Sequence, residues 1–173
     1  LMPFFKSLEA EDPQVEQARQ MLLNWDFVLN KDSIEAGIYV AFERQLLDNI
    51  EALKVPEIAQ SYLSVGMKTT IDMLLAPDGD FGVDPIQGRD EFLIHTLSQG
   101  IATLREKLGP NIENWVYGQE DYKHALIRHP LSPALNDELQ QRLNVGPLPR
   151  GGNGFTLGNT GCLLYTSDAA DDT

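Results

Sequence analysis

The sequence predicts an α+β fold that is mainly helical, with a few short strands after residue 115. Three observations support this prediction. Apolar side chains recur at the spacing of an α-helix through most of residues 13–108. Gly109-Pro110 then marks a stop, because glycine just past a helix end and proline after it are the usual order. Beyond that point, short apolar runs alternate with segments rich in glycine, proline and asparagine, which are typical of strands and loops.

The first helix is predicted to begin at Pro13, because Asp12 is a good N-cap and proline is favoured at the first helical position. Its apolar residues recur at helical spacing: Val15, Ala18, Leu22 and Trp25. Asn30-Lys31 interrupts the pattern.

A second helix is predicted behind Asp32, with Glu35 three residues later in a capping-box-like arrangement. Its long apolar stripe comprises Ile34, Ile38, Phe42, Leu46, Ile50 and Leu53. The charged residues that lie off this stripe are Glu43, Arg44, Asp48 and Glu51.

A third helix is predicted from Pro56 to Leu75, with an irregularity around Gly66. Its apolar residues include Ile58, Tyr62 and Leu63. Residues 77–85 carry turn residues and are predicted to form a loop. A fourth helix is predicted from about Arg89, with one apolar face made by Leu93, Leu97, Ile101, Leu104 and Leu108. Each amphipathic helix needs a partner surface for its apolar face.

After Gly109 the helical spacing of apolar residues ends, and shorter elements are predicted. An irregular or short helical piece is predicted to hold Trp115 and Tyr117, and a strand is predicted over residues 123–128, ended by His129-Pro130. Ser132 is predicted to cap a short helix that carries Leu135, Leu139 and Leu143. Residues 146–161 are rich in glycine, proline and asparagine, with a short strand predicted over residues 155–157.

The composition excludes several classes of partner. The chain has 173 residues and a formal net charge of −13, so its surface argues against binding to nucleic acid or to anionic membranes. No apolar run approaches the roughly 20 residues that span a bilayer. The single cysteine, Cys162, rules out an internal disulfide.

The three histidines do not form a metal-binding pattern. His95 is expected at the surface of the fourth helix, off its apolar face. On a strand, His124 and His129 are five residues apart and would point to opposite faces, so they cannot grip one metal ion. His129 is interpreted as a structural residue that Pro130 holds in extended geometry.

Two loops resemble ligand-binding motifs only superficially. Residues 78–84 carry carboxylates at alternate positions, but an EF-hand loop needs a glutamate where Arg89 stands. Residues 150–154 could be imagined around a phosphate, yet no Lys-Ser/Thr pair follows the glycines. Their glycines are better explained by positive backbone angles or by close packing of another segment.

Residues 114–132 and 146–156 carry the most specific pattern in the chain. A Trp-x-x-Gly element at Trp115 to Gly118 precedes His129-Pro-Leu-Ser132, and a glycine-rich stretch leads to Thr156. In this order the elements resemble the C-terminal part of the β chain in the penicillin acylase (penicillin amidase) family of N-terminal-nucleophile hydrolases. Weaker matches lie in the helical part, at residues 23–26 and 32–33. The motif residues, expected to be structural, are Trp115, Gly118, Tyr122, His124, His129, Pro130, Arg150, Gly151, Gly152 and Thr156.

The resemblance implies a fragment of an αββα fold from a precursor that cleaves itself. The nucleophile would be a serine at the start of the β chain, upstream of Leu1, and it would cleave amide bonds of N-acyl compounds of the penicillin or acyl-homoserine-lactone type. The oxyanion asparagine and the calcium ligands would also lie upstream, so no catalytic and no metal-binding residue is assigned in this chain. The implied partners are a small N-acyl substrate, the α chain and the rest of the β chain. Relatives are usually periplasmic or secreted.

The two ends suggest a truncated piece. Residues 162–173 resemble a translated sequencing adapter and are excluded from fold prediction. Residues 1–161 are then expected to be a partial penicillin-acylase-like region that is cut at both ends. Two alternatives stay open: a non-catalytic helical interaction module, and a family member that has lost its nucleophile.

Overall fold

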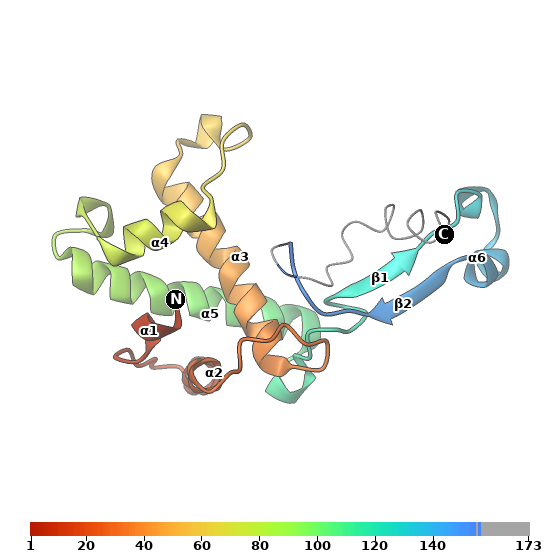
Figure 1. Ribbon diagram of the computed structural model, residues 1–173, viewed down its shortest axis with the longest axis horizontal. Coiled ribbons are helices and arrows are strands. Elements are labelled where there is room, and N and C mark those ends of the chain that lie inside the picture. The colour runs from red at the N-terminus through yellow and green to blue at the C-terminus, as the bar shows by residue number, and fades with distance from the viewer. Residues whose placement is uncertain (155, 157–173) are drawn as a thin grey trace, which may run out of the picture. The chain divides into compact units, whose positions relative to one another are not determined.

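In the computed structural model the described residues are 1–154 and 156 (Figure 1). By its internal contacts the chain divides into two compact units. Unit 1 comprises Leu1–Asp26 and Ile38–Ile112, and unit 2 comprises Phe27–Gly37 and Glu113–Thr173. The predicted mainly helical α+β fold is confirmed: the elements are helices except for one antiparallel pair of short strands among the described residues.

The elements of unit 1 are mostly α-helices. They are α1 (Met2–Phe5), α2 (Pro13–Leu23), α3 (Ile34–Lys54), which begins in unit 2, then η1 (Glu57–Ala59), α4 (Met67–Leu75), η2 (Gly79–Phe81), α5 (Pro85–Leu108) and η3 (Ile112–Asn114), which ends in unit 2. No helix among residues 1–154 and 156 is long and apolar enough to cross a lipid bilayer.

The start of α2 is confirmed. Asp12 caps it, because its Oδ1 accepts hydrogen bonds from the backbone N–H groups of Gln14 at 2.7 Å and Val15 at 3.2 Å. The short helix α1 was not predicted. It contributes Phe5, which is fully buried and packs edge-on against Phe42 with ring centroids 5.2 Å apart.

The cap predicted for the second helix was wrong by one residue. Ser33, not Asp32, precedes α3, and its Oγ accepts a hydrogen bond from the Ala36 N–H at 2.9 Å and donates one to Glu35 at 2.9 Å. The carboxylate of Asp32 instead pairs with Lys31 Nζ at 2.7 Å. The two candidates are adjacent, and only the backbone turn decides which one faces the open amides.

The apolar stripe of α3 forms the centre of the unit 1 core. Four of its predicted residues are fully buried: Ile38, Phe42, Leu46 and Ile50. At the end of the stripe Leu53 is 38% exposed. Glu43 was expected off the stripe but is buried, and the Tyr39 hydroxyl donates a hydrogen bond to its Oε1 at 2.8 Å. This bond offsets part of the cost of burying a carboxylate.

The third predicted helix does not exist as one element. Residues 57–59 form a single 3₁₀ turn, and α4 begins separately after Gly66. Ile58 and Tyr62, two of the apolar residues of the predicted helix, are 88% and 86% exposed. The prediction relied on apolar spacing, but a helix of this kind forms only where a packing surface receives its apolar face.

The fourth predicted helix begins earlier than expected, at Pro85. Asp84 caps it by accepting a hydrogen bond from the Gln87 N–H at 3.1 Å. This is the same Asp-Pro signal that marks α2. Four residues of the predicted apolar face, Leu93, Leu97, Ile101 and Leu104, are buried, whereas Leu108 at its end is only partly buried. The helix ends at Gly109, whose φ of 84° is the left-handed conformation that favours glycine.

Helices α3 and α5 pack closely against each other in unit 1. A Cβ on Gly100 of α5 would lie 3.1 Å from the backbone nitrogen of Phe42 on α3, so a glycine permits this approach. A polar network crosses the same interface: Asn49 Nδ2 donates to Thr96 Oγ1 at 2.9 Å and to Gln99 Oε1 at 2.7 Å.

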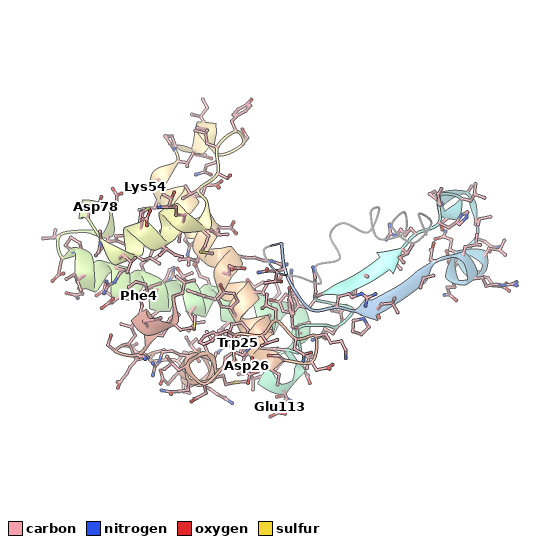
Figure 2. The ribbon with its side chains drawn as sticks, in the orientation of Figure 1. Phe4, Trp25, Asp26, Lys54, Asp78 and Glu113 are labelled. Atoms are coloured by element: carbon pink, nitrogen blue, oxygen red, sulfur yellow. The ribbon has the colours of Figure 1, made fainter. Side chains whose placement is uncertain are left out.

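Two peripheral contacts lie near the ends of these helices, and Figure 2 labels one residue of each, Lys54 and Phe4. Lys54 at the end of α3 reaches toward the loop that carries Asp78 and forms an ion pair with Asp80. The guanidinium of Arg89 lies 5.1 Å from the ring centroid of Phe4, a cation–π distance.

Unit 2 contains β1 (His124–Ile127), η4 (Ser132–Ala134), α6 (Asp137–Leu143) and β2 (Val145–Pro149). The predicted strand over residues 123–128 is confirmed as β1. It pairs antiparallel with β2, which was not predicted because glycine and two prolines hid its strand character. The strand predicted over residues 155–157 lies outside the described residues, except for Thr156.

The cap predicted for the short helix of unit 2 was also wrong. Asn136 caps α6 by accepting a hydrogen bond from the Leu139 N–H at 3.0 Å. Ser132 begins the separate turn η4, is buried, and donates its hydroxyl to Asn144 Oδ1 at 2.5 Å. Both residues are good caps, and the chain bends at the second one.

Candidate functional site

Five of the ten motif residues gather around one short piece of chain, residues 29–37, which we term the anchor segment: Trp115, Gly118, Tyr122, Gly151 and Gly152. Three different stretches contact it: residues 115–118, Tyr122, and residues 151–152. Motif elements that are far apart in the sequence therefore meet at a common point. Of the anchor segment, only residues 32–33 had entered the family resemblance.

The two large aromatic residues of the Trp-x-x-Gly element are the best-buried side chains of this cluster. Trp115 and Tyr117 are both 0% exposed. The Tyr117 N–H donates to Ser33 O at 3.0 Å, and the Tyr117 hydroxyl donates to Gly152 O at 2.7 Å. Tyr117 thus joins the anchor segment to the glycine-rich stretch, and its buried hydroxyl has a hydrogen-bond partner.

Glycine is required at Gly118 by close backbone approach. Its N–H donates to Lys31 O at 2.6 Å, and a Cβ at this position would overlap the Cα and Cβ of Lys31. The second glycine of the pair Gly151-Gly152 has φ of 70° and donates its N–H to Leu29 O at 2.9 Å. The close packing of another segment that the sequence suggested here is found, since a Cβ on Gly151 would overlap Leu29 O.

Tyr122 and Gly37 form the third contact. The Tyr122 hydroxyl donates to Gly37 O at 2.6 Å, and its ring meets that of Tyr117 edge-on with centroids 5.3 Å apart. A Cβ on Gly37 would overlap Trp115 O. Sequence analysis missed Gly37, although a glycine within the first turn of a predicted helix is a signal for close packing.

The histidines lie apart from this cluster and from each other. His95 is exposed on α5, as predicted. His124 is half-buried on β1, and its Nδ1 is buried with no hydrogen-bond partner among the described residues. His129 lies beyond the end of β1, so the prediction of opposite strand faces does not apply to it. It is exposed, as is Pro130, and its Nδ1 accepts a hydrogen bond from the Leu131 N–H at 3.2 Å.

Arg150 and Thr156 flank the glycine-rich stretch. A shallow cavity of about 350 Å³ lies between residues 29–31 and residues 149–152. Lys31 and Arg150 line it, but no serine, threonine, cysteine, histidine or carboxylate does. Thr156 is exposed, and its Oγ1 accepts a hydrogen bond from the Asn153 N–H at 2.7 Å. The cavity therefore has two cationic side chains but neither a hydroxyl or thiol nucleophile nor a histidine or carboxylate base.

Carboxylates do not assemble into a cation site in the part of the chain that the structure describes. Within residues 1–154 and 156, no three His, Cys, Asp or Glu side chains lie close enough to hold a metal ion together. In the loop that superficially resembles a calcium site, Asp78 accepts a hydrogen bond from the Asp80 N–H at 3.1 Å, and Asp80 pairs with Lys54. These contacts account for both carboxylates.

Comparison with known protein families shows to which family the chain belongs. The family model described as penicillin amidase matches residues 1–170. The chain belongs to the penicillin amidase family. This is a family of hydrolases. The match covers both units and extends into residues 162–170, which sequence analysis had assigned to an adapter-derived tail. A search of curated proteins found no match.

Proposed function

We propose that this chain is part of an amidohydrolase that cleaves the amide bond of N-acyl compounds through an N-terminal serine encoded upstream of Leu1. The observation that carries the proposal is the penicillin amidase match over residues 1–170, together with the motif order from Trp115 to Thr156. The substrates would be of the penicillin or acyl-homoserine-lactone type. The proposal also holds that the protein is exported and that this chain assembles with the α chain and the rest of the β chain.

The proposed chemistry is covalent catalysis by an activated hydroxyl. The free α-amino group of the serine accepts the proton of its own hydroxyl, whose oxygen attacks the amide carbonyl carbon. Backbone and side-chain donors stabilise the oxyanion, and the C–N bond breaks as the nitrogen of the leaving amine takes up the proton. Water then attacks the acyl-enzyme ester, which releases the acid and restores the hydroxyl. Calcium, if bound, would be held by residues upstream.

The described residues would contribute scaffold to this reaction. Support comes from the anchor segment, where buried aromatic side chains and glycine contacts hold three stretches of chain together. A hydrolase needs such rigid support, because displacement of a catalytic group by about 1 Å can cost roughly 100-fold in rate. The motif residues are proposed to act by this positioning and not by contact with the substrate.

The reading frame that precedes Leu1 in the source gene tests the proposal. We expect it to encode a serine preceded by a junction of small residues at which the precursor cleaves itself. A second test assays the 173-residue chain alone with a chromogenic N-acyl amide, and no turnover is expected. The extended protein and its serine-to-alanine variant serve as the positive and negative controls. Saturable turnover by the 173-residue chain, or an upstream frame without such a serine, would contradict the proposal.

A further inference from the structure

The glycine-rich stretch contains Asn153-Gly154, which is the only Asn-Gly pair in the sequence. The pair lies directly after Gly152, in a turn that the Thr156 N–H closes by donating to Asn153 O at 3.2 Å. The carboxamide of an asparagine can be attacked by the backbone nitrogen of the next residue, because the two groups close a five-membered ring. Glycine hinders this attack least, since it has no Cβ. The sequence therefore combines the two reacting groups in their most reactive form at this position alone.

The structure leaves the attacking nitrogen open. Gly154 is exposed, and its N–H forms no hydrogen bond within residues 1–154 and 156. The turn uses the N–H and the C=O of Asn153, since that N–H donates to Thr156 Oγ1 at 2.7 Å, but it does not use the Gly154 nitrogen. A β-turn constrains the backbone angles of its two central residues. Asn153 is the first residue of the turn, so the angle that brings its side chain to the Gly154 nitrogen lies outside that constraint.

Two other asparagines show what protects a carboxamide. Asn49 lies within α3, where its side chain donates two hydrogen bonds to α5 and the helix uses the N–H of Ile50, the next residue. Asn136 is exposed, but its Oδ1 accepts the N–H of Leu139 as the cap of α6, and Asp137 follows it. In both cases the carboxamide is held by a hydrogen bond to another element or turn, and the next residue carries a side chain.

We infer that Asn153-Gly154 is a site of spontaneous covalent modification, at which the asparagine converts to isoaspartate and aspartate. The Gly154 nitrogen loses its proton to solvent and attacks Asn153 Cγ. The Cγ–Nδ2 bond then breaks, and the nitrogen leaves as ammonia after it takes up a proton from solvent. One water molecule opens the resulting succinimide ring. Opening at the main-chain carbonyl carbon gives isoaspartate, and opening at Cγ gives aspartate.

Formation of isoaspartate would disturb the contacts of the anchor segment. Gly152, one residue before Asn153, donates its N–H to Leu29 O at 2.9 Å and accepts the Tyr117 hydroxyl at 2.7 Å. Isoaspartate lengthens the main chain by a methylene group and turns the former main-chain carbonyl into part of a carboxylate. The turn that Thr156 closes then loses the carbonyl on which it depends. We expect the neighbouring contacts of Gly152 to weaken.

Incubation of the 173-residue chain in mildly alkaline buffer tests the inference, because base removes the proton of the attacking nitrogen. Peptide mapping by mass spectrometry measures the conversion of each asparagine, and enzymatic methylation detects isoaspartate. Asn153 is expected to convert within about 10-fold of its rate in a synthetic peptide of residues 150–156, since an exposed turn gives little protection. Asn136 is the internal control, and its conversion is expected to be at least about 10-fold slower than that of Asn153. Slower conversion of Asn153 than about 10-fold below the peptide, or equal conversion of Asn136, would overturn the inference.

Gly154→Ala is the matched variant for the attacking residue. The fold accommodates it, because nothing lies within 4 Å of the added Cβ and the φ of Gly154 is outside the left-handed region. The variant is expected to convert at least about 10-fold more slowly at Asn153, since the new methyl group hinders ring closure. Unchanged conversion in this variant, or aspartate formed without isoaspartate in the unchanged chain, would overturn the cyclic route.

Hydrogen–deuterium exchange of the converted chain measures the consequence for the anchor segment. Faster exchange in residues 29–33 is expected than in the unconverted chain, whereas α3 beyond Ile38 should exchange as before. Equal exchange in residues 29–33 would overturn the link between the modification and the anchor segment. None of these measurements reads hydrolysis of an N-acyl substrate, so they succeed or fail independently of the proposed function.

Discussion

Unit 1 and unit 2 are each stabilised internally, by different kinds of contact. In unit 1, amphipathic helices bury stripes of apolar side chains, and the centre of the core is the run from Ile38 to Ile50 on α3. In the described part of unit 2, fewer side chains are buried, and the anchor segment is held by Trp115, Tyr117 and glycines that allow backbone to approach closely. A core of the first kind depends on side-chain periodicity, whereas the second depends on which backbone segments happen to meet.

The largest expected effect comes from removing one buried aromatic residue in each unit. Phe42→Ala and Trp115→Ala should each lower the free energy of unfolding by about 3–5 kcal/mol, because both side chains are fully buried. Hydrogen–deuterium exchange would locate the loss. Phe42→Ala should raise exchange in α3 and α5, and Trp115→Ala in residues 27–37 and 113–127. If either variant raised exchange equally in both units, the distinction between them would fail.

A smaller effect is expected from adding a methyl group at the anchor segment. Gly151→Ala should destabilise the chain by about 1–3 kcal/mol, because the new Cβ overlaps Leu29 O and the backbone must move. The matched control is Gly154→Ala, where nothing lies within 4 Å of the added Cβ. Chemical denaturation of both variants measures the difference. Equal stability of the two would show that close backbone approach does not hold unit 2 together.

The smallest expected effect is a pH dependence in unit 1. Hydrogen bonds from Arg19 and Gln20 lower the pKa of Glu16 to about 2 from its ordinary 4.5. Because the folded pKa is the lower one, this carboxylate stabilises the fold above pH 4.5, and the contribution disappears as the pH falls toward 2. Thermal unfolding of Glu16→Gln should therefore differ from the unchanged chain by about 0.2–1 kcal/mol at pH 7 and converge with it at pH 2.

The control for this titration is Glu11→Gln, which neutralises an exposed carboxylate in the same unit. It should not reproduce the loss of stability at neutral pH. A difference between Glu16→Gln and the unchanged chain that grew as the pH fell would contradict the assigned sign.

Much of unit 1 followed from its sequence because the signals are local. Asp12-Pro13 and Gly109 fix helix ends through their own backbone preferences, and the apolar stripes specify buried faces. The helix predicted over residues 56–75 was wrong, and it shows the limit of predicting helices from local signals. Ile58 and Tyr62 satisfy helical spacing, yet nothing in the spacing tells whether a surface exists to cover them.

For the candidate site, the sequence by itself determined the identity of the motif residues and, through their order, the family. It also predicted β1, whose apolar run is bounded by His129-Pro130. Only the tertiary structure decided what these residues touch. The Tyr122 hydroxyl meets a carbonyl 85 residues away, and the glycine pair meets Leu29. Such contacts produce no periodic pattern of residue types in either segment, because every residue carries the same backbone carbonyl. The anchor segment could therefore be recognised only in the folded structure.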